Sequence, residues 1–186
     1  PVEEIYYIHG LLGVAEYPGT INVRGNYAFG VGGGMKVNDR ILIEGGFLSS
    51  SFEVEKMYTD IYPSITDMQQ YTGMLSTKFQ FFTARMRPVV GALVAYQYRV
   101  FTDKRNSSYY GGGGQASSNA VDLGLLTGVD IELTKGFSVG AEFKYLWNMT
   151  SKTSSSLGSI VNPARVGTPI EKLNQYLFTI NGRLNF

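Results

Sequence analysis

Hydrophobic and polar side chains alternate along most of this chain, and the alternation stops at regular intervals. In residues 26–37, for example, Tyr27 and Phe29 alternate with Asn26, Ala28 and other small or polar residues. Successive side chains of a β-strand point to opposite faces, so a period of two predicts a strand with one apolar and one polar face. The pattern predicts eight such strands, at residues 4–16, 26–37, 41–48, 70–81, 90–100, 121–131, 137–148 and 176–186.

The segments between these strands are alternately long and short. The long ones cover residues 17–25, 49–69, 102–119 and 149–172, and the short ones lie at 38–39, 85–88 and 134–136. In an up-and-down antiparallel sheet every second connection lies at the same end, so the long segments gather at one rim and both chain ends at the other. We therefore predict an all-β fold, a single domain over residues 1–186 that forms an eight-stranded antiparallel up-and-down barrel.

Two kinds of barrel share this alternation, and they differ in which face points inward. In a soluble barrel of the lipocalin type the apolar face lines a ligand cavity, whereas in a transmembrane barrel it meets lipid and the polar face fills the lumen. Eight strands enclose a bore just wide enough for side chains, and the apolar face carries too many aromatic rings to fit there. We therefore predict a transmembrane barrel with short periplasmic turns and long extracellular loops, and we place His9 of the first strand inward.

With this orientation, equal numbers of cations and anions point into the lumen. They are Lys36, Lys78, Arg99, Lys144 and Arg183, against Glu44, Asp122, Asp130, Glu132 and Glu142. Buried charges are costly unless they are paired, so the balance predicts a network of ion pairs. From the positions along neighbouring strands we expect the pairs Arg99 with Asp122, Glu142 with Arg183, and Lys78 with Glu44. The lumen is therefore predicted to be plugged, without a continuous channel.

The amino-acid composition argues against several classes of function. Charged residues make up only 17% of the chain, below the usual quarter, and the net charge of +1 does not favour a nucleic-acid partner. The absence of cysteine excludes disulfides, a thiolate nucleophile and cysteine-ligated metals. No secretion signal is visible at the start of the sequence, and a protein of the outer membrane requires one, so we expect one upstream of residue 1.

No catalytic, cofactor or metal site is predicted. His9 is the single histidine and lies near the middle of its strand, where packing is a commoner role than catalysis. The glycine-rich run 30–34 lies within a predicted strand and is followed by no helix, so a structural role is favoured over a nucleotide loop. The acids Glu53, Asp60 and Asp67 are interpreted as solvated loop residues rather than as a cation site.

The last strand carries a further pattern, because its apolar positions end on an aromatic residue at the C-terminus. These positions are Tyr176, Phe178, Ile180, Leu184 and Phe186. A chain that ends in this way resembles the C-terminal strand of bacterial outer-membrane β-barrels, and the resemblance implies that the barrel-assembly machinery recognises this strand. Together with the whole-chain pattern, the sequence resembles the group of the OmpA transmembrane domain and OmpX. OmpW is less similar, because its lumen is apolar.

This resemblance implies a location in the outer membrane of a Gram-negative bacterium, in contact with its lipid and lipopolysaccharide. It also implies a non-enzymatic role in envelope structure and surface interaction through the long loops. The alternatives are a narrow solute channel, a lipid-handling protein and a lipid-modifying enzyme. Small residues on the apolar face also suggest a wall for a homo-oligomer, although glycine can equally relieve strain in a curved sheet. That wall would consist of Gly10, Gly33, Gly45 and Gly182.

Overall fold

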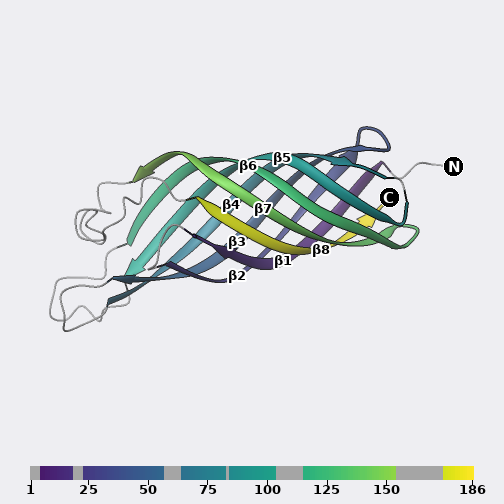
Figure 1. Cartoon of the computed structure of the whole chain (residues 1–186). Coiled ribbons are helices and arrows are strands. Elements are labelled where there is room, and N and C mark those ends of the chain that lie inside the picture. Colours follow the sequence, from purple (N-terminus) through teal and green to yellow (C-terminus); the bar gives the residue numbers. More distant parts are fainter. Residues whose placement is uncertain (1–4, 19–22, 57–63, 83, 104–114, 154–173) are drawn as a thin grey trace.

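Eight antiparallel strands close into a barrel in which each strand pairs with the next along the chain and β8 pairs with β1 (Figure 1). The computed structural model describes residues 5–18, 23–56, 64–82, 84–103, 115–153 and 174–186. The strands are β1 (Tyr6–Glu16), β2 (Val23–Lys36), β3 (Ile41–Lys56), β4 (Ser64–Gln80), β5 (Met86–Asp103), β6 (Gln115–Thr134), β7 (Phe137–Thr153) and β8 (Gln175–Asn185). No helix among the described residues is long and apolar enough to cross a membrane. The predicted eight-stranded antiparallel barrel is therefore confirmed.

Several strands are longer than the alternation predicts, chiefly at the rim opposite the chain termini. The predicted loop 49–69 is wrong at both ends, because β3 continues to Lys56 and β4 begins at Ser64. Likewise 23–25, 102–103, 115–119 and 149–153 belong to strands. Strands can extend beyond the apolar alternation because their ladder is formed by backbone hydrogen bonds. In the extended part of β3 and β4, the inward side chains of Phe52 and Met68 are fully buried. Serine and acidic residues on the other face hid this extension in the sequence.

The short connections lie at the rim that holds the termini. In the first, the side-chain oxygen of Asn38 accepts hydrogen bonds from the backbone N–H groups of Arg40 and Ile41, at 2.9 and 2.8 Å. In the third, Gly136 adopts φ 90°, a conformation that favours glycine. The predicted turn at 85–88 is wrong in part, because β5 begins at Met86 and includes Pro88. Pro88 lies near the strand start, where its carbonyl oxygen accepts a hydrogen bond from the N–H of Phe81 at 3.1 Å.

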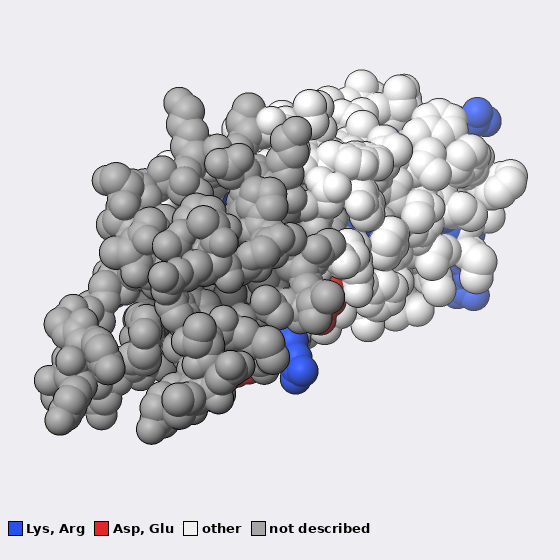
Figure 2. Space-filling view, turned by 60° about the vertical axis from the view of Figure 1, so that its left-hand side comes forward, with Lys and Arg blue, Asp and Glu red and all other residues white. Residues whose placement is uncertain are grey.

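The outer wall of the barrel is apolar. Many of its exposed side chains are aromatic rings, as in membrane barrels. Phe47, Tyr71 and Tyr98 stack in one group, with ring centroids 6.1 and 6.5 Å apart, and near the short-turn rim Phe79 meets Phe81 edge to face at 5.5 Å. On the face drawn in Figure 2 most of the described wall is free of charge, with Lys and Arg at the short-turn end and charges of both signs toward the opposite end. The predicted outward direction of the apolar face is correct.

The barrel closes where the two terminal strands meet. β1 pairs with β8 from Tyr7 with Asn185 to Glu16 with Tyr176. Beyond the ladder, Tyr6 and Phe186 exchange two backbone hydrogen bonds of 2.9 and 3.2 Å. The last residue of the chain therefore completes the seam.

Inward glycines make room for large neighbours inside this narrow bore. A Cβ atom on Gly32 would lie 2.5 Å from Nε2 of His9, and one on Gly30 would lie 3.0 Å from Cδ1 of Leu48. The glycine-rich run 30–34 of β2 therefore has the structural role that the sequence favours. His9 points inward and is buried, as predicted.

Candidate functional site

The lumen contains a chain of charged side chains on the short-turn side. The residues alternate in sign and come from five strands, in the order Lys144, Glu142, Lys78, Glu44, Arg183 and Asp130. Lys144 lies 2.5 Å from Glu142, and Arg183 lies 3.2 Å from Glu44 and 3.0 Å from Asp130, measured between nitrogen and oxygen. Lys78 contacts both Glu142 and Glu44. We call these six residues the ionic chain.

Aromatic and hydroxyl groups complete the surroundings of the ionic chain. The hydroxyl of Tyr7 donates a hydrogen bond to Glu44 at 2.7 Å, and its ring lies 4.4 Å from the guanidinium carbon of Arg183. Lys144 also donates to the hydroxyl of Thr179 at 3.1 Å. All six charged members are buried. Because each cation has at least one anion as a direct neighbour, the cost of burying these charges is offset within the lumen.

A second polar group lies farther toward the other rim and is built mainly from amides. It consists of Tyr17, Gln70, Thr72, Gln97, Arg99, Asp122, Asn148 and Gln175, which we call the amide cluster. Nε of Arg99 donates to Gln70 at 3.0 Å and to the hydroxyl of Tyr17 at 3.2 Å. Asp122 accepts hydrogen bonds of 3.0 Å from both Gln97 and Asn148.

The predicted pairs agree with this geometry in one case of three. Lys78 and Glu44 are in contact. Arg183 contacts Glu44 and Asp130 rather than Glu142, and Arg99 contacts Gln70 and Tyr17 rather than Asp122. Counting residues from the rim ignores the stagger of tilted strands. The β6 partner of Arg99 is Ser118, four positions from Asp122, and this offset separates the two expected partners.

An apolar layer separates the ionic chain from the amide cluster. On β4, Met74 lies between Lys78 and Gln70, and on β7, Leu146 lies between Glu142 and Asn148. β6 and β8 repeat this order at Leu126 and Leu177. With these four residues we group the inward Leu11, Gly30, Leu48 and Leu93 of the remaining strands as the apolar layer. Within it, Leu93, Leu126 and Leu146 form one cluster with Ala95 and Met74. The alternation predicts the inward direction of these residues but does not reveal that they form a single layer.

A small cavity lies between the apolar layer and the ionic chain. Its volume is about 20 Å³, and His9, Ser76, Glu44 and Glu142 are among its lining residues. This is room for one water molecule. No group of three or more histidine and acidic side chains among the described residues can hold a metal ion.

The two remaining predicted lumen charges, Lys36 and Glu132, lie near the short-turn rim. Arg87 pairs with Glu132, and Lys36 lines a polar hollow of about 410 Å³ together with Asp39 and Lys135. Lys36 is half-buried there. The rim therefore presents both signs of charge to the periplasmic side.

The predicted glycine wall and the predicted assembly signal both lie on the outer face. Gly10 pairs with Gly182 across the seam, and Gly33 pairs with Gly45 on the next two strands. Phe178, Ile180, Leu184 and Phe186 are exposed on the wall. Tyr176 packs against Phe143 with ring centroids 6.0 Å apart.

Sequence reasoning missed two members of the amide cluster. Tyr17 is predicted to lie in a loop, although it continues the period of two through Leu11, Gly13 and Ala15. Gln175 falls outside the predicted last strand, although it is fully buried against Gln70 at 3.1 Å. Extending each alternation by one or two residues past its last apolar position would have found both.

Solved structures with the same fold include a surface protein, an attachment protein and an outer membrane protein of three bacteria. Neisserial surface protein A is 14% identical, with a TM-score of 0.61 and 97% of each chain covered. A major outer membrane protein from Thermus thermophilus is 11% identical, with a TM-score of 0.62 over 97% of this chain and 99% of that one. Ail, the attachment invasion locus protein of Yersinia pestis, solved with the heparin analogue sucrose octasulfate, is 12% identical, with a TM-score of 0.56 over 98% and 99%.

Sequence comparison gives the family. No curated protein matches the chain, but the family model described as Opacity family porin protein matches residues 49–162, from within β3 to beyond β7. The barrel topology, the apolar wall and these comparisons place the protein in the outer membrane of a Gram-negative bacterium. Since the match covers more than half of its residues, the chain belongs to the Opacity family of porin proteins.

Proposed function

We propose that this protein is a non-enzymatic outer-membrane barrel with a closed lumen, which serves envelope structure and surface interaction. The observation that carries this proposal is the apolar layer between the ionic chain and the amide cluster. Ion pairs alone leave polar paths through a lumen. The buried leucines between the two polar groups remove polar partners that a hydrated ion needs along such a path.

The outer rim supports a role in surface interaction. β5 and β6 remain paired as far as Thr102 with Gln115, well beyond the stacked ring of Tyr98. A paired ladder gives the segments that connect the strands a rigid base outside the membrane. Ail is described as an attachment protein and neisserial protein A as a surface protein. By analogy, we propose that this chain also contacts molecules outside the cell. The identity of those molecules is not transferred from the two relatives.

The surroundings of His9 favour a non-enzymatic role. Serine, histidine and glutamate side chains do meet at the small cavity, in Ser76, His9 and Glu44. Its volume of about 20 Å³ admits one water molecule and no substrate. The apolar layer also separates the cavity from the outer rim, so lipid A has no route to His9.

We also propose that copies of the barrel associate through the glycine wall. A Cβ on Gly10 would meet nothing within 4 Å, and those on Gly45 and Gly182 would meet only ordinary contacts at 3.9 Å. Packing within one barrel therefore does not require glycine at these three positions. This makes strain relief a weaker explanation for the glycines than contact with a second copy. Cross-linking in native membranes tests this association, and a purely monomeric population would contradict it.

Conductance in planar lipid bilayers tests the closed lumen. The purified barrel is expected to insert without stepwise current, because an ion would have to shed its hydration shell at the leucine layer. A porin of larger bore, reconstituted in the same way, controls for insertion. Steady openings of defined size would contradict the proposal and favour the narrow channel instead.

A further inference from the structure

A long groove crosses the outer wall from β3 to β7. Its volume is about 980 Å³, and Ile41, Phe79, Val90, Thr127, Phe143 and Tyr145 are among the residues that line it. All its lining residues belong to the described strands, and most of their side chains point away from the lumen. The groove therefore belongs to the surface that faces the membrane.

The register of four strands explains its shape. Phe79 on β4 pairs with Val90 on β5, Val90 pairs with Thr127 on β6, and Thr127 pairs with Phe143 on β7. An aromatic ring therefore lies at each end of this row, and the shorter side chains of Val90 and Thr127 lie between the two rings. One step farther from the short-turn rim, Tyr145 continues the second ridge beyond Phe143. The result is a trough that crosses β5 and β6, with Phe79 at one end and Phe143 and Tyr145 at the other.

Because the trough lies on the membrane-facing wall, membrane lipids are the molecules that contact it. Its outward side chains are apolar except for the hydroxyls of Thr77, Thr127 and Tyr145 and the indole N–H of Trp147, and it lies on the membrane-facing wall. A flexible acyl chain can lie along a trough between two ridges and recover the contacts that a gap would forfeit. The glycine wall lies on β8, β1, β2 and β3 and shares no residue with the groove, which reaches β3 only at Ile41.

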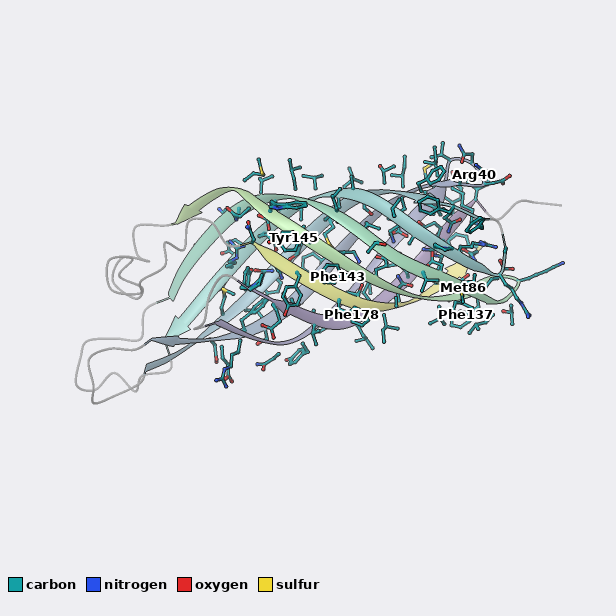
Figure 3. The ribbon with its side chains drawn as sticks, in the orientation of Figure 1. Arg40, Met86, Phe137, Phe143, Tyr145 and Phe178 are labelled. Atoms are coloured by element: carbon teal, nitrogen blue, oxygen red, sulfur yellow. The ribbon has the colours of Figure 1, made fainter. Side chains whose placement is uncertain are left out.

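A cation stands where this trough reaches the short-turn rim. Arg40 directly precedes Ile41, which lines the groove, and its side chain is exposed. Its backbone is fixed on both sides, because Asn38 accepts from its N–H at 2.9 Å and its own carbonyl accepts from the N–H of Gln80 at 2.7 Å. Figure 3 shows Arg40 at this rim and Phe143 and Tyr145 farther along the wall. Short turns face the periplasm, so Arg40 lies at the headgroup level of the inner leaflet.

We propose that the groove and Arg40 together form a site for one anionic phospholipid of the inner leaflet. One acyl chain lies in the trough between Phe79 and Phe143, and the guanidinium of Arg40 contacts the phosphate. Guanidinium and phosphate match in charge and in hydrogen-bonding geometry. This site goes beyond the proposed function and does not depend on it, because it lies outside the lumen.

Native mass spectrometry of the purified barrel, with added phosphatidylglycerol or phosphatidylcholine, tests the site. We expect one phosphatidylglycerol to be retained in preference to phosphatidylcholine. Thr127→Phe fills the trough and should abolish this retention, whereas Val31→Phe, on the exposed wall of β2, should not. Arg40→Gln should weaken binding about fivefold, the effect of one cation near an anionic surface, and Lys135→Gln on another turn of the same rim should leave it nearly unchanged.

Three outcomes would overturn the proposal. Equal retention in Thr127→Phe and Val31→Phe would exclude the groove as the seat of the lipid. Equal retention of the two lipids, or no change in Arg40→Gln, would exclude recognition of the anionic headgroup. A dimer that Thr127→Phe dissociates would assign the groove to a second copy of the chain. Heat-dependent migration of the folded barrel on gels shows that each variant is folded before its lipid is counted.

Discussion

Gly32 on β2 leaves the space that the imidazole of His9 on β1 occupies. The two residues are cross-strand partners, and a Cβ on Gly32 would lie 2.5 Å from Nε2 of His9 and 2.6 Å from the carbonyl oxygen of Gly45. The second of these contacts is with backbone, which cannot move aside as a flexible side chain can. Neighbouring strands therefore pack in a complementary way inside the barrel, because the glycine of one strand leaves room for the large inward side chain of the next.

Gly32→Ala is expected to lower the free energy of unfolding by about 1–3 kcal/mol, the usual cost of overpacking a filled interior. Gly10→Ala is the matched control, because its Cβ meets nothing within 4 Å on the outer wall. Urea titration of the barrel in lipid vesicles, followed by the fluorescence of Trp147, measures both. Equal stability of the two variants would show that the lumen is less tightly packed than the structure indicates.

Lys78 holds the middle of the ionic chain, where it contacts both Glu44 and Glu142. Lys78→Met removes the cation between two buried carboxylates and should cost about 3–5 kcal/mol, the range for breaking a buried ion pair. The double variant Lys78→Met with Glu44→Gln should recover part of this loss, since it removes one of the facing anions and leaves Lys144 paired with Glu142 and Arg183 with Asp130. Lys135→Met, at an exposed turn, serves as the control. No recovery in the double variant would contradict the role of charge balance.

The apolar layer makes a separate prediction for conductance. Replacing Leu93 and Leu126 together by serine introduces hydroxyls into the middle of the layer and frees volume there. Stepwise currents should then appear in planar bilayers, while the doubly substituted pair Leu123→Ser and Leu125→Ser, on the lipid-facing side of β6, should remain silent. A silent Leu93→Ser/Leu126→Ser barrel would show that the ionic chain alone is enough to close the lumen.

Phe186 is expected to act in assembly as well as in the seam. Deleting it removes two backbone hydrogen bonds to Tyr6 and the terminal aromatic residue of the last strand. If the assembly machinery recognises this residue, the deletion should reduce the amount of barrel in the outer membrane much more than it slows folding into pure lipid vesicles. Similar losses in cells and in vesicles would assign Phe186 a structural role alone.

The strand pattern was accessible from the sequence because a period of two is a local property. Tyr27 and Phe29 alternate with small residues whether or not a partner strand is known, and the order of long and short segments then gives the topology. The outward direction of the apolar face followed from volume, because the aromatic rings of that face do not fit inside a barrel of eight strands. The extension of β3 past Ser49 was not accessible, because pairing between Glu53 and Asp67 depends on the backbone of another strand.

The amino-acid sequence by itself determined the barrel, the outward apolar wall and the presence of balanced charges inside. Only the tertiary structure decided which charges meet. The stagger between neighbouring strands sets the height of every inward side chain, and it brings Arg183 to Asp130 and Glu44 rather than to Glu142. The same stagger brings Leu93, Leu126 and Leu146 of three strands into one apolar cluster, because height in a tilted barrel is a property of all eight strands together.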